Sequence, residues 1–239
     1  MHNEAFAYMW QFLGYPWPLE QSPDLPLDQK AAQQPAYIDF SHTQLQLGSA
    51  AHTGFMFDNE KWQHEILAPP FSITTHAVSN AEYLEFLQLG CHTTEDRTAM
   101  KPAYWRHDGG QWFEKFFDQW LEIDLDAPVR HISASKAERY CSWRGLRLPT
   151  EHELSVLMAS TDLAWTHSKL WEWTSSAFLP FEGFSPDPYH DYSAPWFDGK
   201  HRVLKGWSAF TASDLRRPGY RNFYLPSRQD LFCGFRTCL

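Results

Sequence analysis

Histidine and cysteine side chains, both present in this 239-residue chain, can ligate a metal and act as acids, bases or nucleophiles. The chain holds twelve histidines and four cysteines, yet the spacings H-x-x-x-H, H-E-x-x-H and C-x-x-C do not occur. Cys233 and Cys238 have an unusual spacing for a metal or redox pair, and cysteine is often simply buried. We therefore expect the cysteines to be reduced and structural.

A helix is predicted over residues 1–14, because apolar residues recur on one face at three- and four-residue spacing, namely Ala5, Phe6, Met9, Trp10 and Leu13. Its first turn carries His2 and Glu4, which on their own would be ordinary solvated residues of a terminus. Residues 15–35 are rich in proline and lack periodicity, as is typical of an extended linker. We place a domain boundary there, with a second domain over residues 36–239.

The segment from Leu170 to Leu239 organises that second domain. Its strand signals are only a few residues long and are cut by Gly, Pro, Asn and Asp, so most of the backbone must be irregular. Buried irregular backbone needs hydrogen-bond partners, and the interleaved Trp, Arg and Asn side chains can donate to loop carbonyls. The pattern predicts an α+β, loop-rich domain whose aromatic residues mostly form a core.

Regular elements are expected at a few places. Ser79 and Glu82 form a capping-box pattern for a helix to about Leu89. Two further helices are predicted over Ser135–Trp143, which Gly145 ends, and over Glu151–Ala159, which Thr150 caps. The short alternating runs 37–40 and 45–48 suggest a hairpin at the entrance of the domain.

Bulk properties exclude some classes of partner. The formal charge of −9, without a block of Lys or Arg, argues against binding nucleic acid or an anionic membrane through a basic surface. No apolar run is long enough to span a bilayer, so we expect no membrane partner and a cytoplasmic location. No glycine-rich nucleotide-binding pattern is present, and small-molecule chemistry fits better.

The order of several short motifs is more specific than any of these properties. They are Phe57-Asp58-Asn59-Glu60-Lys61, Val78–Tyr83, Pro128–Ser133, Arg147-Leu148-Pro149-Thr150-Glu151, Leu170–Thr174, Arg217–Phe223 and Cys233–Thr237. Together they resemble the sulfatase-modifying-factor superfamily, which has the formylglycine-generating-enzyme (C-type-lectin-like) fold and includes the EgtB enzymes of ergothioneine biosynthesis. The resemblance covers most of the chain and implies that fold for residues 36–239, although likeness of fold alone does not give function.

The same resemblance implies a role for residues 1–14. EgtB-like enzymes carry an H-x-x-x-H-x-E motif on a DinB-like helical domain, where the histidines ligate iron. Met1-His2-Asn3-Glu4 is similar to the end of that motif, which implies that His2 is one Fe(II) ligand and Glu4 its trailing acid. We then expect residues 1–14 to be the remnant of that domain and the iron site to be incomplete in this chain.

The resemblance also implies an activity. EgtB enzymes use iron(II) and O2 to join sulfur, or in the selenoneine-synthase branch selenium, to the imidazole of hercynine. The thiol or selenium donor stays open here, with the ending Phe235–Cys238 closer to the selenoneine-synthase-like branch. The implied substrate-binding residues are Tyr220, Arg221, Asn222 and Arg236, and an aromatic side chain would hold the trimethylammonium group. The alternative is a non-catalytic binding or scaffold module of the same fold.

His201 is the implied catalytic residue. It stands where EgtB enzymes have a tyrosine near the iron, in the segment His201–Ser208. Because an imidazole titrates near neutral pH and is a poorer one-electron donor than a phenol, we expect His201 to act as an acid or base. The alternative is that His201 only hydrogen-bonds a loop.

Overall fold

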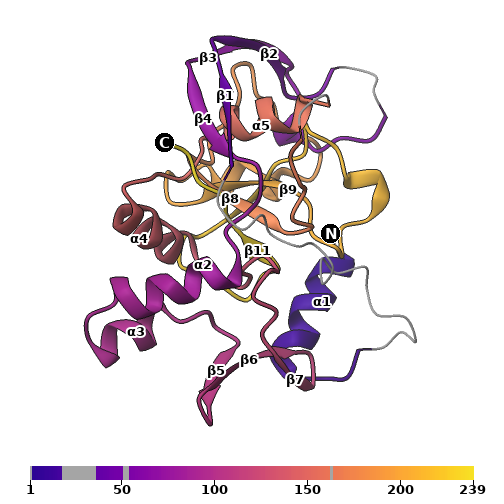
Figure 1. The fold of residues 1–239 in the computed structure, drawn as a ribbon. Coiled ribbons are helices and arrows are strands. Elements are labelled where there is room, and N and C mark those ends of the chain that lie inside the picture. The colour runs from indigo at the N-terminus through magenta and orange to yellow at the C-terminus, as the bar shows by residue number, and fades with distance from the viewer. Residues whose placement is uncertain (1, 18–35, 51–53, 162–163) are drawn as a thin grey trace.

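The central sheet of the protein is built entirely from residues 171–234. The computed structural model describes residues 2–17, 36–50, 54–161 and 164–239. The sheet has the order β10-β9-β8-β11 (Figure 1), with its strands at Asn222–Tyr224, Arg202–Gly206, Trp171–Ala177 and Cys233–Gly234, respectively. β9 pairs antiparallel with β8 and β10, whereas β11 runs parallel to β8. The segment expected to organise the domain therefore supplies its central sheet.

Three smaller sheets surround this one. β1 (Tyr37–Phe40) pairs with β4 (Phe71–Thr74), and β2 (Thr43–Leu47) pairs with β3 (His64–Ala68). β5, β6 and β7 form a meander, over Trp105–Asp108, Gln111–Phe116 and Gln119–Glu122. The predicted hairpin between residues 37–40 and 45–48 is wrong, because each run pairs with a strand from residues 64–74 instead of with the other.

The helices follow their capping signals. α2 (Asn80–Glu85) begins with a complete Ser79/Glu82 capping box and continues as a π-helical turn at Phe86–Gly90. α4 (Ala134–Arg144) is capped by Ser133 and ends at Gly145, whose positive φ of 71° suits glycine. α5 (Glu151–Ala159) begins with the Thr150/Glu153 capping box. These three predictions are confirmed; α3 (Thr94–Met100) was not predicted.

Short 3-10 turns shape the long loops. They lie at Asp58–Glu60, His190–Tyr192, Ala194–Trp196 and Ser213–Leu215. The two middle turns belong to residues 178–201, which join β8 to β9 without a regular strand or longer helix. The loop-rich α+β architecture predicted from the sequence is confirmed.

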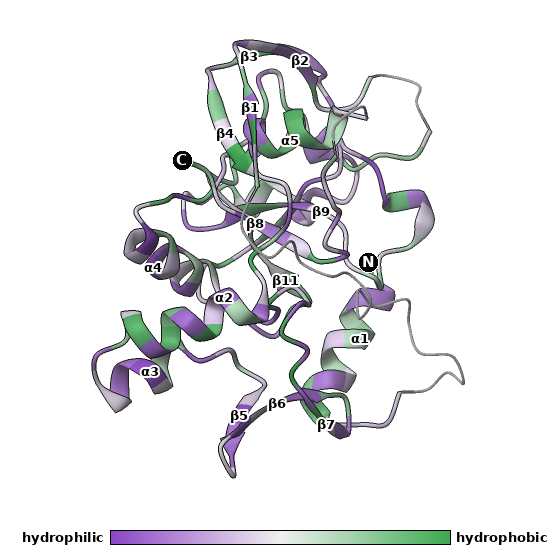
Figure 2. Ribbon diagram, in the orientation of Figure 1, coloured by the Kyte–Doolittle hydropathy of each residue, from purple (hydrophilic) through white to green (hydrophobic). Residues whose placement is uncertain are grey.

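Apolar residues gather in separate cores. The largest packs α2 and α4 against the central sheet and contains Tyr83, Phe86, Tyr140, Trp173 and Phe235. A second core joins β4 to α5 through Phe71, Ile73, Leu154 and Leu157, and Figure 2 shows both elements in the green of hydrophobic residues. All four cysteines are free and buried, as expected from their spacing.

Buried polar side chains hold the loops to these cores. The Trp173 indole donates to the Ile132 carbonyl at 2.7 Å. Arg236, which is fully buried, pairs with Glu172 at 2.6 Å and donates to the carbonyls of Thr74 and Thr166. The expectation that Trp and Arg side chains serve carbonyls of irregular backbone is confirmed.

Helix α1 (His2–Leu13) stands beside the rest of the molecule, with its end next to β7 (Figure 1). Gln11 is fully buried; its amide donates to the Lys115 carbonyl at 2.8 Å and accepts from the Phe117 amide at 2.6 Å. Of the predicted apolar face, Phe6, Met9 and Leu13 are 57%, 48% and 52% exposed, whereas Trp10 packs against the core around Ala7 and Phe117. Of the residues described, no helix has the length and apolar character needed to cross a membrane.

Candidate functional site

A cavity of about 710 Å³ lies between α1, the end of the loop before β9, and β10. Three parts of the chain that are far apart in sequence therefore meet there. The cavity is lined by Tyr8, Tyr189, Asp191, Tyr192, Trp196, His201, Asn222, Phe223, Tyr224, Leu225, Ser227 and Arg228. Aromatic walls around a few polar groups are typical of a small-molecule site.

His201 lies in this cavity, directly before β9. Its Nδ1 atom is 3.0 Å from Oδ1 and 3.1 Å from Oδ2 of Asp198. The ring packs edge-on against Trp196, at 5.2 Å between centroids. His201 is 9% exposed, so most of the imidazole is shielded while part of it lines the cavity. This position suits the acid–base role predicted for His201.

Asn222 and Tyr224 reach the cavity from β10. Phe223, which lies between them on the strand, lines the cavity as well, so the whole of β10 borders it. Asn222 and Tyr224 also border a much smaller cavity beside Glu4 and Trp171. Burial raises the pKa of Tyr224, with the nearby Tyr8 adding to the effect, so the Tyr224 hydroxyl stays protonated at neutral pH.

Tyr220 is buried in the domain and does not line the larger cavity. Its ring is buried, stacks 5.6 Å from Phe57 and packs edge-on against Trp171 at 5.3 Å. Burial raises the pKa of Tyr220, and the charge of Glu4 raises it further, whereas the Tyr192 side chain opposes this. Tyr220 therefore connects the cavity residue Tyr192 to the α1 contact.

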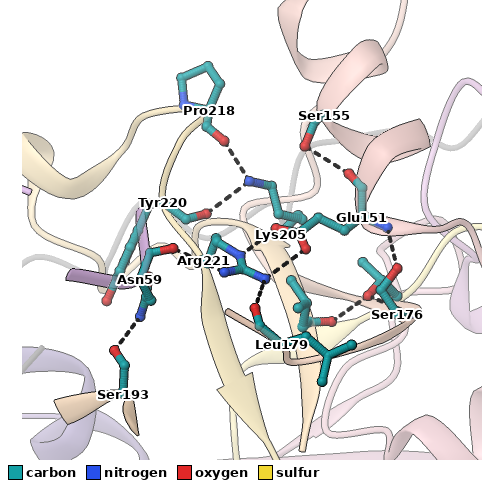
Figure 3. A network of polar contacts seen from close by, with 12 residues as sticks. Asn59, Glu151, Ser155, Ser176, Leu179, Ser193, Lys205, Pro218, Tyr220 and Arg221 are labelled. Atoms are coloured by element: carbon teal, nitrogen blue, oxygen red, sulfur yellow. Dashed lines mark hydrogen bonds and ion pairs between the residues drawn. The ribbon is translucent and has the colours of Figure 1, made fainter. Parts of the chain in front are cut away.

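Arg221 is the centre of a buried polar network (Figure 3). Its Nε and Nη2 atoms lie 2.6 and 3.0 Å from the two carboxylate oxygens of Glu151. Further bonds of 3.0 Å run to the carbonyls of Asn59 and Leu179. Arg221 is 2% exposed and points away from the cavity. These contacts fix the chain directly before β10, and substrate contact by Arg221 stays a prediction.

Lys205 completes the network. It is 1% exposed, and its Nζ donates to the carbonyls of Pro218 at 2.6 Å and Tyr220 at 3.1 Å (Figure 3). Burial lowers the pKa of Lys205 to about 8, although the Glu151 carboxylate opposes this. Burial alone would raise the pKa of Glu151, but Arg221 and Lys205 bring it below its usual range. The network thus holds residues 218–221 in place from both sides.

Arg236 is not among the residues that line the cavity. All of its described polar contacts are the buried ones to Glu172, Thr74 and Thr166. Of the four predicted substrate-binding residues, the structure thus brings Asn222 into the cavity with His201. Tyr220 and Arg221 lie behind β10, and Arg236 joins β8 to the end of the chain.

Glu4 connects α1 to the central sheet. Its Oε1 accepts bonds from the Trp171 indole at 2.7 Å and from the Ser208 and Thr211 hydroxyls at 2.6 Å each. Because Glu4 and Tyr8 lie one turn apart on α1, the same contact brings Tyr8 to the cavity, where its ring is 4.8 Å from the Arg228 guanidinium.

The residues present do not form an iron site. His2 is exposed at the start of α1, and one oxygen of Glu4 already accepts three hydrogen bonds. Within residues 2–17, 36–50, 54–161 and 164–239, no group of three or more His, Cys, Asp or Glu side chains is placed to hold a metal. His2 as an iron ligand stays a prediction.

Several cavity residues were missed by sequence reasoning. Tyr8, Tyr192, Trp196 and Arg228 come from segments with no distinctive spacing, so only the fold brings them together. Asp198 had a usable signal, since Asp followed by Gly favours a turn in which the carboxylate bonds to nearby backbone. Its Oδ1 accepts from the amides of Lys200 at 2.8 Å and His201 at 3.1 Å.

Comparison with known proteins identifies the family. Residues 23–167 match the model of the sulfatase-modifying factor enzyme 1-like domain, and the chain belongs to this family. The fold agrees: PvdO from Pseudomonas aeruginosa superposes with a TM-score of 0.54 at 17% identity, covering 84% of this chain and 93% of that one. Treponema denticola variable protein 1 gives 0.55 at 15%, covering 85% and 94%.

Curated relatives are found among proteins of ergothioneine biosynthesis. The chain is 29% identical to hercynine oxygenase of Mycolicibacterium smegmatis over 238 residues, covering 75% of this chain and 55% of that protein. It is 30% identical to ergothioneine biosynthesis protein 1 of Schizosaccharomyces pombe, covering 76% and 27%. The chain spans about half the length of the hercynine oxygenases it matches.

Proposed function

We propose that this chain is the substrate-pocket part of an EgtB-like enzyme of ergothioneine or selenoneine biosynthesis. The observation that carries the proposal is the cavity between α1 and β10, where His201 and Asn222 lie among tyrosine and tryptophan rings. Its ligand would be hercynine, whose trimethylammonium group suits aromatic faces and whose imidazole can exchange a proton with His201. The relatives named hercynine oxygenase support this choice of ligand.

We assign different roles in binding hercynine to the residues that line the cavity. Trp196 and Tyr192 would contact the trimethylammonium group, because a tetraalkyl cation cannot donate hydrogen bonds and is held best by ring faces. Arg228 lines the same cavity and would contact a substrate carboxylate while its Nε and Nη2 atoms remain paired with Asp230 at 2.8 and 3.0 Å. Asn222 would hydrogen-bond the ligand from β10, held in place by the network around Arg221.

We further propose that α1 belongs to a helical, DinB-like domain. One face of α1 is docked through Glu4, Ala7 and Gln11, while Phe6, Met9 and Leu13 on the other face are exposed. Burial of those three side chains against further helices would be favourable. Residues 18–35, the predicted linker, lie outside the residues the structure describes.

The proposed activity of the whole protein is oxygen-dependent formation of a C–S or C–Se bond on hercynine, with Fe(II) as cofactor and a cytoplasmic location. His2 would contribute one iron ligand, and the remaining ligands would have to come from outside the residues described. In this chain we expect His201 to move the proton and the aromatic walls to bind the substrate.

Hercynine binding tests the proposal on the chain as it exists. Isothermal titration should show saturable binding of hercynine, and at least tenfold weaker binding of histidine, which lacks the methyl groups that ring faces recognise. His201→Gln should keep the thermal midpoint and weaken hercynine binding. Equal affinity for hercynine and histidine, or no saturable binding of either, would refute the assigned substrate and favour a scaffold module.

A further inference from the structure

The Asp198 carboxylate and the His201 imidazole form a hydrogen-bonded pair. The surrounding backbone determines which of the two side chains donates the hydrogen. Oδ1 of Asp198 accepts the amide hydrogens of Lys200 and His201 at 2.8 and 3.1 Å. The bond with His201, followed by that with the Lys200 amide, lowers the pKa of Asp198, so it is ionised at neutral pH. An ionised carboxylate only accepts hydrogen bonds, so Nδ1 of His201 must carry the hydrogen between them.

Away from Asp198, the His201 ring contacts aromatic side chains. Trp196 and Phe223 pack edge-on at 5.2 and 6.3 Å between centroids, and their ring edges offer no acid or base to the imidazole. Within the described part of the chain, the hydrogen bonds of the His201 ring are both made by Nδ1, and His201 lines the cavity. With Nδ1 bonded to Asp198, Nε2 is the ring nitrogen left for a ligand.

We propose that Asp198 is a positioning residue that holds the hydrogen of neutral His201 on Nδ1 and presents the Nε2 lone pair to the cavity as a proton acceptor. A proton leaving a bound ligand would be taken up at Nε2, giving an imidazolium whose Nδ1–H still faces Asp198. Loss of that proton from Nε2 to water restores the neutral ring. Only the identity of the donor as hercynine rests on the proposed function.

The carboxylate supplies two effects that a neutral partner would not. It selects one tautomer, and its negative charge stabilises the imidazolium that forms when Nε2 takes a proton. Aspartate has this role beside histidine in the Ser-His-Asp triad, where replacement by asparagine leaves the geometry but gives the wrong tautomer. The Asp198 geometry allows the same substitution to be used as a test.

In Asp198→Asn, the amide oxygen can keep both backbone bonds of Oδ1, so the turn is preserved. The NH2 group then takes the place of Oδ2, which lies 3.1 Å from Nδ1. An NH2 donor at that point favours an accepting Nδ1, whereas the amide oxygen at the place of Oδ1, 3.0 Å from Nδ1, can still accept from Nδ1–H. Asp198→Asn should therefore lower the share of the Nδ1–H tautomer of His201 without loss of the fold, and Asp198→Ala, which offers no side-chain acceptor, should lower it further.

The tautomer can be read directly by 15N NMR of the histidine rings at about pH 8.5, where imidazoles are neutral. His201→Gln assigns the His201 signals. Two other histidines calibrate the measurement. Nδ1 of His64 lies 2.9 Å from the Trp62 carbonyl and must carry hydrogen, whereas Nδ1 of His167 accepts from the Lys169 amide at 2.9 Å and must lack it.

We expect His201 to match His64 in the wild type and to shift toward His167 in Asp198→Asn, with an unchanged thermal midpoint. A wild-type hydrogen on Nε2, or an unchanged tautomer in a folded Asp198→Ala protein, overturns the proposal. If Asp198→Asn does not fold, the wild-type tautomer alone decides it. These signals need no substrate, so absent hercynine binding with the expected tautomers would refute the proposed function and leave the Asp198–His201 assignment standing.

Discussion

The indole N–H of Trp171 donates to the carboxylate of Glu4 at 2.7 Å, across 167 residues of sequence. Ser208 and Thr211 donate to the same oxygen, so one acceptor on the first turn of α1 gathers donors from β8 and from the loop after β9. Because Tyr8 follows one turn later, the contact sets how α1 closes the cavity. Glu4 thus docks the helix, whatever part it has beside a metal.

Glu4→Ala should release α1. The substitution leaves the Trp171 indole and two hydroxyls without their acceptor, and hydrogen bonds to charged groups are worth about 1.5–3 kcal/mol each, less where water can replace them. We expect a loss of about 2 kcal/mol in unfolding free energy and faster hydrogen exchange along α1. Asn3→Ala, at an exposed position of the same turn, is the matched control. Unchanged exchange in α1 would show that Glu4 does not dock the helix.

Arg221→Ala should be among the most destabilising single changes. It leaves the buried Glu151 carboxylate unpaired, and removing one partner of a buried pair costs about 3–5 kcal/mol. Arg139→Ala is the control, because Arg139 is 57% exposed, lies 3.8 Å from Asp96 and should cost less than about 1 kcal/mol. Urea denaturation measures both. Similar losses in the two variants would mean that the network around Arg221 carries little stability.

Stability should fall as the pH drops from about 6.5 toward 4. Burial lowers the pKa of His131 to about 3, and burial lowers that of His167 to about 4. Both depressed values mean that the unfolded chain binds protons in this window while the folded chain does not, so each histidine contributes up to about 1.4 kcal/mol per pH unit.

The variant His131→Asn tests whether His131 causes this pH dependence of the unfolding free energy. His131 has a φ of 59°, a conformation that asparagine tolerates, so the variant keeps the turn while removing the titrating group. The unfolding free energy, measured by urea denaturation from pH 4 to 7, should depend less on pH in His131→Asn than in the wild type. An identical slope would assign the acid sensitivity to other groups. His107→Asn, at an exposed histidine, is the control.

Trp196→Leu should weaken hercynine binding by about 2- to 30-fold, which corresponds to the 0.5–2 kcal/mol of a cation–π contact. Histidine, which carries a primary ammonium, should lose less. Trp120→Leu is the control, since Trp120 lies on β7 away from the cavity residues and is similarly exposed, at 38% against 42%. Equal losses for hercynine and histidine would place the trimethylammonium group elsewhere.

The sequence predicted what is decided locally. Ser79/Glu82, Thr150/Glu153 and Gly145 each carry their own hydrogen-bonding or conformational preference; the two capping boxes begin helices and Gly145 ends one, as expected. The partners of β1 and β2 could not be predicted in this way, because β4 and β3 match the alternating runs as well as the runs match each other. Strand pairing is set by the core that the strands share.

The candidate site was predicted only in part for a similar reason. His201 and Asn222 were named from motifs, but the cavity exists because α1 brings Tyr8 to Arg228 and because residues 189–196 fold over β10. Membership of a sequence motif does not distinguish Arg221 and Arg236 from Asn222 as candidate substrate-binding residues. Burial distinguishes them, since both arginines face carboxylates and carbonyls inside the domain.

The parallel pairing of β11 with β8 also has a consequence for synthesis in the cell. Glu172 gains its counter-charge only after Arg236, 64 residues later, has been synthesised. The Thr74 carbonyl accepts a hydrogen bond from the same side chain, which follows 162 residues later. Until residues 233–236 have left the ribosome, β8 has an unpaired edge and a buried carboxylate has no counter-charge. Such distant pairings slow folding and leave apolar surface open to aggregation. Production of this domain should therefore gain from low temperature and chaperone supply.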